Sequence, residues 1–304
     1  MSGGIFSRKK GKSVKEGKGH RKQGIIRAGK LSGQGARESQ QDAFCVAGEE
    51  CPECGILAVV ADGMGGLAGS GQVSETIVNS MLEAYAPGGE ETAACAVDAP
   101  EPGETSAIQA PGKASGSCAP GCAGISPARQ LQLLFRQAQA RVDALLSGGR
   151  TKSGSTVVAC IVKDQELSWL AVGDSRIYLW RAGGVVQLNQ DHDFARDLTM
   201  LAMQGEMTFA EADRDPRRES LTSYVGAGFP RRVEFNREAV RLLPGDKILL
   251  VSDGVYRALS QKEMADALLG SAEQAAKQLQ DKILQKSLPQ QDNFTAIILD
   301  ITEK

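Results

Sequence analysis

The chain contains 304 residues, of which 41% are hydrophobic and 24% are charged, as is ordinary for a soluble globular protein. This length allows one large domain or two small ones, with a core that needs no disulfides. The formal net charge of -2 provides no bulk field directed at nucleic acid or at an anionic membrane. Because the chain has only two histidines, a histidine-rich zinc enzyme and a Ser-His-Asp hydrolase are both disfavoured.

The cysteines and the apolar runs indicate the compartment. Seven cysteines are an odd number with uneven spacing, and most stand beside apolar or small residues, which favours reduced thiols in a cytoplasm. The longest apolar runs, such as residues 55–61 and 247–251, are far too short to cross a bilayer. The first residues also lack the apolar segment of a secretory signal. We therefore expect a cytoplasmic protein with no transmembrane segment.

Two stretches lack the patterns of regular structure. The N-terminal stretch is rich in Lys, Arg, Gly and Ser against a single acid, Glu16, and predicts a disordered basic tail over residues 1–23. Such a tail is either a solvated terminus or a docking arm for an acidic partner or membrane surface. Residues 87–127, rich in Pro, Gly, Ala and Ser, predict a disordered surface insertion. The rest of residues 24–304 is expected to form one domain.

Apolar runs joined by short turns predict antiparallel strands. In chain order, the predicted strands are residues 55–61, 157–162, 167–172, 176–180, 185–188, 247–251 and 294–301. A strand near Phe44 is expected to form a hairpin with the first of these. Short turns between successive strands indicate hairpins and not parallel crossovers.

Helical patterns separate the groups of strands. Apolar residues at helical spacing predict a helix through Val73, Ile77, Met81 and Tyr85. A second helix follows the cap Ser126-Pro127 and carries Leu131, Leu134, Phe135, Ala138, Val142 and Leu145. Capping boxes at residues 260–263 and 271–274 begin two more helices. Antiparallel strands with helices on their outer faces make a layered α+β domain.

Four aspartates stand at the ends of apolar strands, namely Asp62, Asp174, Asp253 and Asp292. The end of a strand holds a ligand rigidly, and hard divalent cations prefer oxygen ligands. A glycine after Asp62 and after Asp253 allows close approach of the backbone carbonyl. One Asp-Gly pair alone is more simply a hairpin turn. Four such positions in one domain instead favour a cation site.

A series of short motifs, taken together, identifies a family. In chain order they are Arg37-x-x-x-x-Asp42, Ala61-Asp62-Gly63-Met64-Gly65-Gly66, Ser153-Gly154-Ser155-Thr156, Val172-Gly173-Asp174-Ser175-Arg176, Asp191-His192, Leu221-Thr222-x-x-Val225-Gly226, Gly245-Asp246, Ser252-Asp253-Gly254 and Asp292-Asn293-Phe294-Thr295. The set resembles the PP2C (PPM) family of metal-dependent protein serine/threonine phosphatases, in its bacterial form. The resemblance covers about residues 24–301, apart from the insertion.

The resemblance implies a four-layer α/β/β/α sandwich of two antiparallel sheets, with metal ions in a cleft at one end. It implies that Asp62 bridges two core Mn²⁺ or Mg²⁺ ions and that the Gly63 carbonyl binds the second. Asp253 and Asp292 resemble the other direct ligands of the first ion. The resemblance further assigns Asp42 to an outer-shell water and Asp174, with Asp253, to a third and weaker ion.

The implied activity is hydrolysis of phosphoserine and phosphothreonine in proteins by water that the two ions activate. Arg37 matches the arginine that grips the substrate phosphate. Met64 stands where eukaryotic members usually carry a histidine proposed to protonate the leaving group, and methionine cannot donate a proton. Bacterial members commonly have methionine here. Our hypothesis is that a water held near Asp174 is the acid.

For the remaining residues, the sequence indicates either a structural role or two alternative roles. The segment 193–232 matches the flap beside the cleft, where Arg217 and Arg218 are either solvated or in contact with the protein substrate. His192 is expected to form structural hydrogen bonds and not to bind metal. Cys45 and Cys160 are expected in the core. A four-thiolate zinc site is an alternative to free thiols at Cys51, Cys54, Cys118 and Cys122.

The implied partners are phosphorylated proteins, with a bacterial serine/threonine kinase and its substrates as the natural opponent and no nucleic acid. Two other functions stay open. The first is an inactive relative that acts as a scaffold. This function is disfavoured because the chain retains the residues of the implied site, namely Asp62, Asp253, Asp292 and Arg37. A regulatory phosphatase of the SpoIIE type would act on an anti-sigma-factor antagonist, and the Arg37 and Asp174 motifs argue against it.

Overall fold

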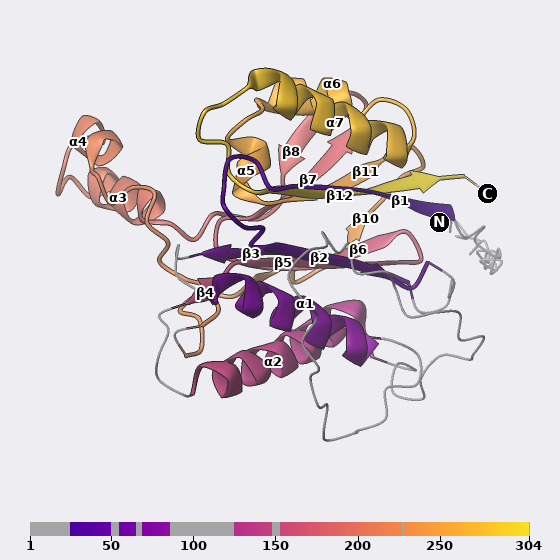
Figure 1. Cartoon of the computed structure of the whole chain (residues 1–304), viewed down its shortest axis with the longest axis horizontal. Helices are drawn as coiled ribbons and strands as arrows, with labels where there is room; N and C mark the ends of the chain where they lie inside the picture. Colours follow the sequence, from indigo (N-terminus) through magenta and orange to yellow (C-terminus); the bar gives the residue numbers. More distant parts are fainter. Residues whose placement is uncertain are drawn as a thin grey trace, which may run out of the picture.

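The computed structural model describes residues 25–49, 55–64, 69–85, 125–147, 153–226 and 228–303. In these ranges two antiparallel sheets lie face to face and helices cover their outer faces, in four layers (Figure 1). The predicted α/β/β/α sandwich is therefore confirmed. The proposed basic tail and most of the proposed insertion lie outside the described residues.

The first sheet contains five strands. Their order is β1 (Ile25–Gly33), β12 (Phe294–Thr302), β11 (Lys247–Val251), β7 (Arg176–Arg181) and β8 (Gly184–Gln187). Its outer face is covered by α5 (Asp253–Tyr256), α6 (Gln261–Ala267) and α7 (Ala272–Lys286). Ser260 and Ser271 form the capping boxes predicted for α6 and α7.

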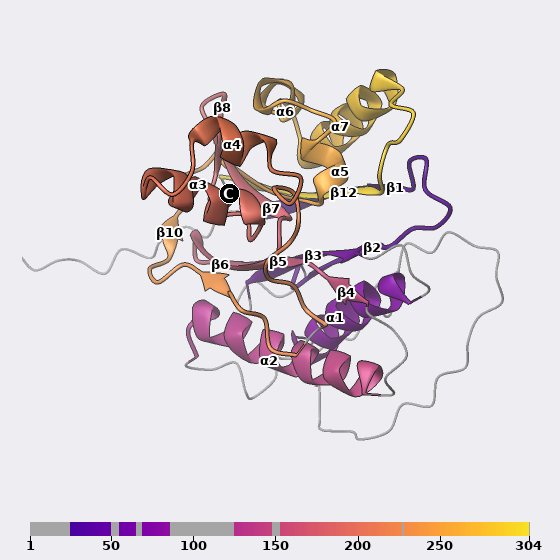
Figure 2. The same ribbon diagram turned by 90° about the vertical axis from the view of Figure 1, so that its left-hand side faces the viewer.

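The second sheet has the order β10 (Val240–Arg241), β6 (Glu166–Val172), β5 (Val157–Lys163), β3 (Ile56–Met64) and β2 (Asp42–Ala47). Two short strands, β4 (Gly154–Ser155) and β9 (Glu234–Phe235), pair with β3 and β6. The helices α1 (Ser70–Tyr85) and α2 (Pro127–Leu146) cover this sheet on its outer face (Figure 2).

The central strand β3 shows why its sequence is apolar without alternation. Leu57 and Val59 pack against α1 and α2, whereas Ala58 and Val60 pack against the other sheet. Successive side chains of a strand point to opposite faces, and both faces of this strand are buried. The predicted hairpin with the strand near Phe44 is confirmed, because β2 and β3 pair antiparallel from Asp42↔Asp62 to Ala47↔Leu57.

The helix α2 confirms its predicted start and corrects two details. Ser126 Oγ accepts a hydrogen bond from the Arg129 amide, and Pro127 occupies the first turn. The helix therefore begins at the last residue of the predicted insertion. Leu145, predicted on the buried face, is 45% exposed and lies outside the core.

Strand β1 has no clear pattern in the sequence and is formed by tertiary pairing. It pairs with β12 along its whole length, from Ile25↔Thr302 to Gly33↔Phe294. A Cβ at Gly29 would lie 2.0 Å from the carbonyl oxygen of Ala272. The glycine is therefore required where the start of α7 crosses this strand.

The segment 193–232 contains α3 (Phe194–Met203) and α4 (Phe209–Arg214), which project from the end of the sandwich (Figure 1). A small apolar cluster of Leu198, Ala202 and Ala212 holds the two helices together. We keep the name flap for residues 193–232. No helix in the described ranges combines the length and apolar character needed to span a bilayer.

Candidate active site

Five aspartates gather around the end of the sandwich where the strands deliver them. Asp42 begins β2 and faces Asp62 across the pairing of β2 with β3. The other three lie in connections: Asp174 follows β6, Asp253 follows β11 as the first residue of α5, and Asp292 precedes β12. The charges of all four neighbours act on Asp62. Tertiary structure thus brings the four predicted strand-end carboxylates together with Asp42.

The backbone around Asp62 is held tightly. The Asp62 carbonyl accepts hydrogen bonds from the Thr156 amide and from Ser155 Oγ, both at 2.9 Å. The next amide, of Gly63, donates to the carbonyl of Gln41 at 3.0 Å. A Cβ at Gly63 would lie 2.6 Å from the carbonyl oxygen of Ser70, so only glycine fits here.

Ser252 is a site residue that the sequence motifs did not assign. Its Oγ donates to Asp42 Oδ2 at 2.7 Å and accepts from the Thr295 amide at 2.9 Å. Asp42 Oδ1 is buried and has no hydrogen-bond partner among the described residues. Ser252 thereby ties Asp42, from the second sheet, to β12 of the first.

Burial sets the protonation of these carboxyl groups. It raises the pKa of Asp62 well above its ordinary value, an effect that the charges of Asp42 and Asp253 increase. Burial also raises the pKa of Asp42 to about 7, against the lowering effect of the Ser252 hydrogen bond. The pKa of Asp174 is raised to about 6 by burial and by the charge of Asp253. The protein alone therefore disfavours the fully ionised cluster.

These residues fit hard divalent cations such as Mn²⁺ or Mg²⁺. The donors are all oxygens, the carboxylates repel one another, and nothing in the described ranges pairs with the buried Oδ1 of Asp42. Within the described residues, no three acidic, histidine or cysteine side chains stand close enough together to hold a metal ion by themselves. This is compatible with such ions, because Mg²⁺ is usually held by one or two carboxylates and several waters.

Arg37 lies at the rim of the cluster. Its Nη2 forms an ion pair with Asp292 Oδ2, and its side chain is 54% exposed. Asn293 holds the loop that carries it, with Nδ2 donating to the carbonyl oxygens of Gln34 at 2.8 Å and Ser39 at 3.1 Å. The Gln41 amide donates to Asn293 Oδ1 at 2.9 Å. Asn293, quoted in a motif but given no role there, thus positions the arginine loop.

Tyr256, the last residue of α5, and Arg257, which caps that helix, contact the acids of the cluster. The hydroxyl of Tyr256 donates to Asp174 Oδ2 at 3.3 Å. Arg257 Nε lies 3.0 Å from Asp253 Oδ2. Burial, together with the charge of Asp174, raises the pKa of Tyr256, so its hydroxyl keeps the proton that it donates. The sequence carries no signal for these contacts.

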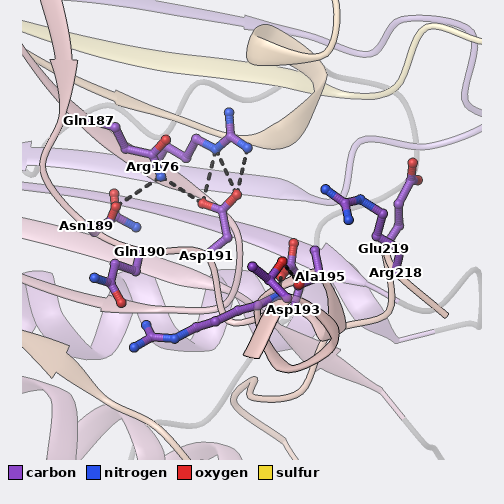
Figure 3. Close-up of a pocket in the computed structure, with 11 residues that line it drawn as sticks. Arg176, Gln187, Asn189, Gln190, Asp191, Asp193, Ala195, Arg218 and Glu219 are labelled. Atoms are coloured by element: carbon purple, nitrogen blue, oxygen red, sulfur yellow. Dashed lines mark hydrogen bonds and ion pairs between the residues drawn. The ribbon is translucent and has the colours of Figure 1, made fainter. Parts of the chain in front are cut away.

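Several motif residues stabilise the fold and have no place in the acidic cluster. Arg176 binds Asp191 through two nitrogens, with the shortest contact 2.6 Å from Nη2 to Oδ2 (Figure 3). Buried His192 accepts a hydrogen bond at Nδ1 from the Gly173 amide, so the structural hydrogen bonding expected of it is present. Asp246 is 2% exposed and accepts from Arg181 Nη2 at 2.6 Å.

A pocket of about 670 Å³ lies beside the cluster, between β7, the β8 connection and the flap (Figure 3). Asp191 and Arg176 line one side of it, and Arg218 and Glu219 of the flap line another. The flap arginines are paired, because Arg217 contacts Asp215 at 2.7 Å and Arg218 contacts Asp213 at 2.9 Å. They are therefore held by the flap itself.

The cysteine predictions have mixed outcomes. Cys45 and Cys160 are buried and reduced, as expected, and burial raises the pKa of each thiol to about 12. The four cysteines of the zinc alternative, Cys51, Cys54, Cys118 and Cys122, lie outside the described residues, and the zinc alternative stays a hypothesis.

Comparison with known proteins agrees with this architecture. The serine/threonine phosphatase stp of Listeria monocytogenes serotype 4b (strain F2365) is 25% identical over 252 residues, which cover 82% of this chain and 86% of that protein. The solved PPM Ser-Thr phosphatase MsPP of Mycobacterium smegmatis, in complex with cacodylate, is 26% identical. Its TM-score is 0.65, and the match covers 91% of this chain and 99% of that chain.

A third likeness concerns the fold alone. The catalytic domain of the phosphatase PstP, solved in complex with 2 manganese ions, has a TM-score of 0.63 at 21% identity and covers 92% of this chain and 100% of that chain. The family model described as protein phosphatase 2C matches residues 32–291. This match includes four of the five aspartates of the cluster and ends just before Asp292, so it leaves out β12 and most of β1. The chain belongs to the PP2C family of protein phosphatases.

Proposed function

We propose that this chain is a metal-dependent phosphatase that hydrolyses phosphoserine and phosphothreonine in proteins. The observation that carries the proposal is the convergence of five aspartates beside Arg37 at one end of the sandwich. A concentrated set of buried carboxylates suits divalent cations, and an adjacent guanidinium suits a phosphate.

The aspartates are assigned as follows. Asp62, Asp253 and Asp292, with the Gly63 carbonyl, would hold two Mn²⁺ or Mg²⁺ ions. Asp42 would act through a water, and Asp174, with Asp253, would hold a third ion. When bound, such ions supply Lewis acidity and activate water as a nucleophile. The fit to oxygen-binding ions supports these assignments, as does the PstP structure with 2 manganese ions for the shared fold.

Arg37 is assigned to the phosphate. A guanidinium binds two phosphate oxygens with parallel hydrogen bonds and can stabilise the charge that spreads over them during phosphoryl transfer. Its half-exposed position at the rim supports this role, since a phosphate on a protein surface must approach from solvent. Exchange of the Asp292 contact for phosphate contacts would then orient the substrate.

The physiological substrates are assigned by chemistry. We infer that they are phosphoproteins made by a bacterial serine/threonine kinase, in keeping with the serine/threonine phosphatases that this chain resembles. The inactive scaffold is the second candidate, and a regulatory phosphatase of the SpoIIE type is a third.

The first test is hydrolysis of a phosphothreonine peptide with added Mn²⁺, with EDTA, and with the Asp253→Ala variant. We expect turnover in Mn²⁺, none in EDTA and a loss of more than about 100-fold in the variant, since a lost outer partner alone costs 10–100-fold. No turnover by folded protein that binds Mn²⁺ would refute the enzyme and favour the scaffold.

The role of Asp174 has its own test. We expect Asp174→Ala to keep two bound Mn²⁺ ions per chain while reducing turnover of the same peptide by at least about tenfold. Calorimetric titration with Mn²⁺ measures the stoichiometry, and steady-state kinetics measures the turnover. Unchanged turnover would remove Asp174 from the mechanism.

A further inference from the structure

We propose that Tyr256 is a positioning residue for Asp174, clamped in place by the Arg176–Asp191 pair. The inference rests on the proposed function, because it concerns the carboxylate assigned to the third ion. It adds a residue that lies outside the motifs of the sequence, at the other end of the short helix that begins with Asp253.

The first observation is the hydrogen bond from Tyr256 to Asp174. Asp174 lies in the turn between β6 and β7, where its carboxylate also accepts a hydrogen bond from its own backbone. Among the hydrogen bonds between side chains, the contact with Tyr256, 3.3 Å from the hydroxyl to Oδ2, joins this turn to α5. The turn and the helix are 82 positions apart in the chain. The hydroxyl therefore restricts the rotation of a carboxylate that must meet a ligand in a defined direction.

The second observation is that the tyrosine ring is itself held. The guanidinium carbon of Arg176 lies 3.6 Å from the centre of the Tyr256 ring, in the stacked geometry of a cation–π contact. Asp191 fixes the guanidinium in this place, because it accepts from Nε at 3.1 Å and from Nη2 at 2.6 Å. Figure 3 shows Asp191 facing the guanidinium end of Arg176.

These contacts form a chain from the pocket to the acidic cluster. Asp191 lines the pocket, Arg176 connects it to the Tyr256 ring, and the Tyr256 hydroxyl reaches Asp174. Each link is a packed or hydrogen-bonded contact between partly buried groups, where such contacts are stronger than in water. The orientation of the Asp174 side chain is consequently influenced by residues that are not its neighbours in the sequence.

The test compares two tyrosines that both contact the guanidinium of Arg176. Tyr256→Phe removes the hydroxyl on Asp174 but keeps the ring under Arg176. Tyr178→Phe removes a hydroxyl on Arg176 and does not touch Asp174, which makes it the matched control. Both changes keep the aromatic ring, and thermal unfolding checks that each variant is folded. Mn²⁺ binding is measured by calorimetric titration, and turnover of a phosphothreonine peptide is measured over a range of Mn²⁺ concentrations.

We expect Tyr256→Phe to weaken the weakest Mn²⁺ binding step by roughly fivefold, as for the loss of one hydrogen bond to a carboxylate. The Mn²⁺ concentration for half-maximal turnover should rise by a similar factor, with the tighter binding steps unchanged. Tyr178→Phe should leave both quantities as in the parent. In an Asp174→Ala background, Tyr256→Phe should have no further effect on binding.

Equal Mn²⁺ binding by the parent and both variants would overturn the proposal. Equal weakening by Tyr256→Phe and Tyr178→Phe would also overturn it, because the effect would then come from Arg176 and not from the hydroxyl on Asp174. The binding measurement is independent of turnover. Absence of turnover in the parent would therefore count against the phosphatase function while leaving the comparison of the tyrosines decisive for Tyr256.

Discussion

Replacing Asp62 with asparagine should reduce turnover of a phosphothreonine peptide by more than about 100-fold while leaving the metal-free protein at least as stable as the parent. Asp62 is the centre of the acidic cluster, and its neutral variant cannot serve as the shared anionic ligand. The two halves of this expectation have different causes. The activity depends on the charge of the carboxylate, and the stability is diminished by it.

The direction of the stability effect follows from the pKa of Asp62. Burial raises this pKa in the folded state above the value of the unfolded chain. The stability that the protonated group contributes is present below its unfolded pKa, about 3.9, and is lost as pH rises through the folded pKa. At neutral pH in EDTA the asparagine variant avoids this loss, so its melting temperature should equal or exceed that of the parent.

A matched buried aspartate provides the control. Asp246 accepts hydrogen bonds from Arg181 Nε at 2.8 Å and from the Leu243 amide at 2.7 Å, far from the cluster in the fold. We expect Asp246→Asn to lower stability by about 1–3 kcal/mol without changing turnover per folded molecule. The proposed role of Asp62 would be wrong if its variant kept turnover within tenfold of the parent. Added Mn²⁺ should raise the melting temperature of the parent more than that of Asp62→Asn.

Breaking a buried ion pair between β11 and β12 should change the free energy of unfolding strongly and leave the activity unchanged. Lys247 and Asp300 are direct partners across β11 and β12, with Nζ 2.7 Å from Oδ1. Their side chains are only 6% and 10% exposed, so solvent screens the pair little. We expect Lys247→Met to cost about 3–5 kcal/mol, because it leaves the Asp300 charge buried and unpaired. Denaturant unfolding measures the change.

A double substitution separates the ion pair from simple packing. Lys247→Met combined with Asp300→Leu should recover most of the stability, since replacing both charges by apolar groups removes the unpaired charge. Turnover per folded molecule should be unchanged in both variants, because Lys247 lies at the opposite end of β11 from Asp253. If the single variant lost less than about 1 kcal/mol, the pair would behave as a screened surface contact.

The sequence predicted those parts of the fold whose signals are local. The strands of the core have continuous apolar runs because both of their faces are buried, and such runs are visible without a structure. The helix caps at Ser126, Ser260 and Ser271 depend on neighbours within three residues, and all three are confirmed. Strand β1, in contrast, exists because β12 pairs with it from the far end of the chain.

The candidate site also has a part that local sequence patterns predict and a part that only tertiary contacts create. By itself, the sequence determined the family and the aspartates that end the strands, because an apolar run followed by a carboxylate is a local pattern. Only the tertiary structure decided which groups support these carboxylates. Ser252 lies 210 positions from Asp42 and Tyr256 lies 82 positions from Asp174. It also decided that Arg176, Asp191, His192 and Asp246 hold the fold together, because a hydrogen bond depends on distances that no spacing in one chain specifies.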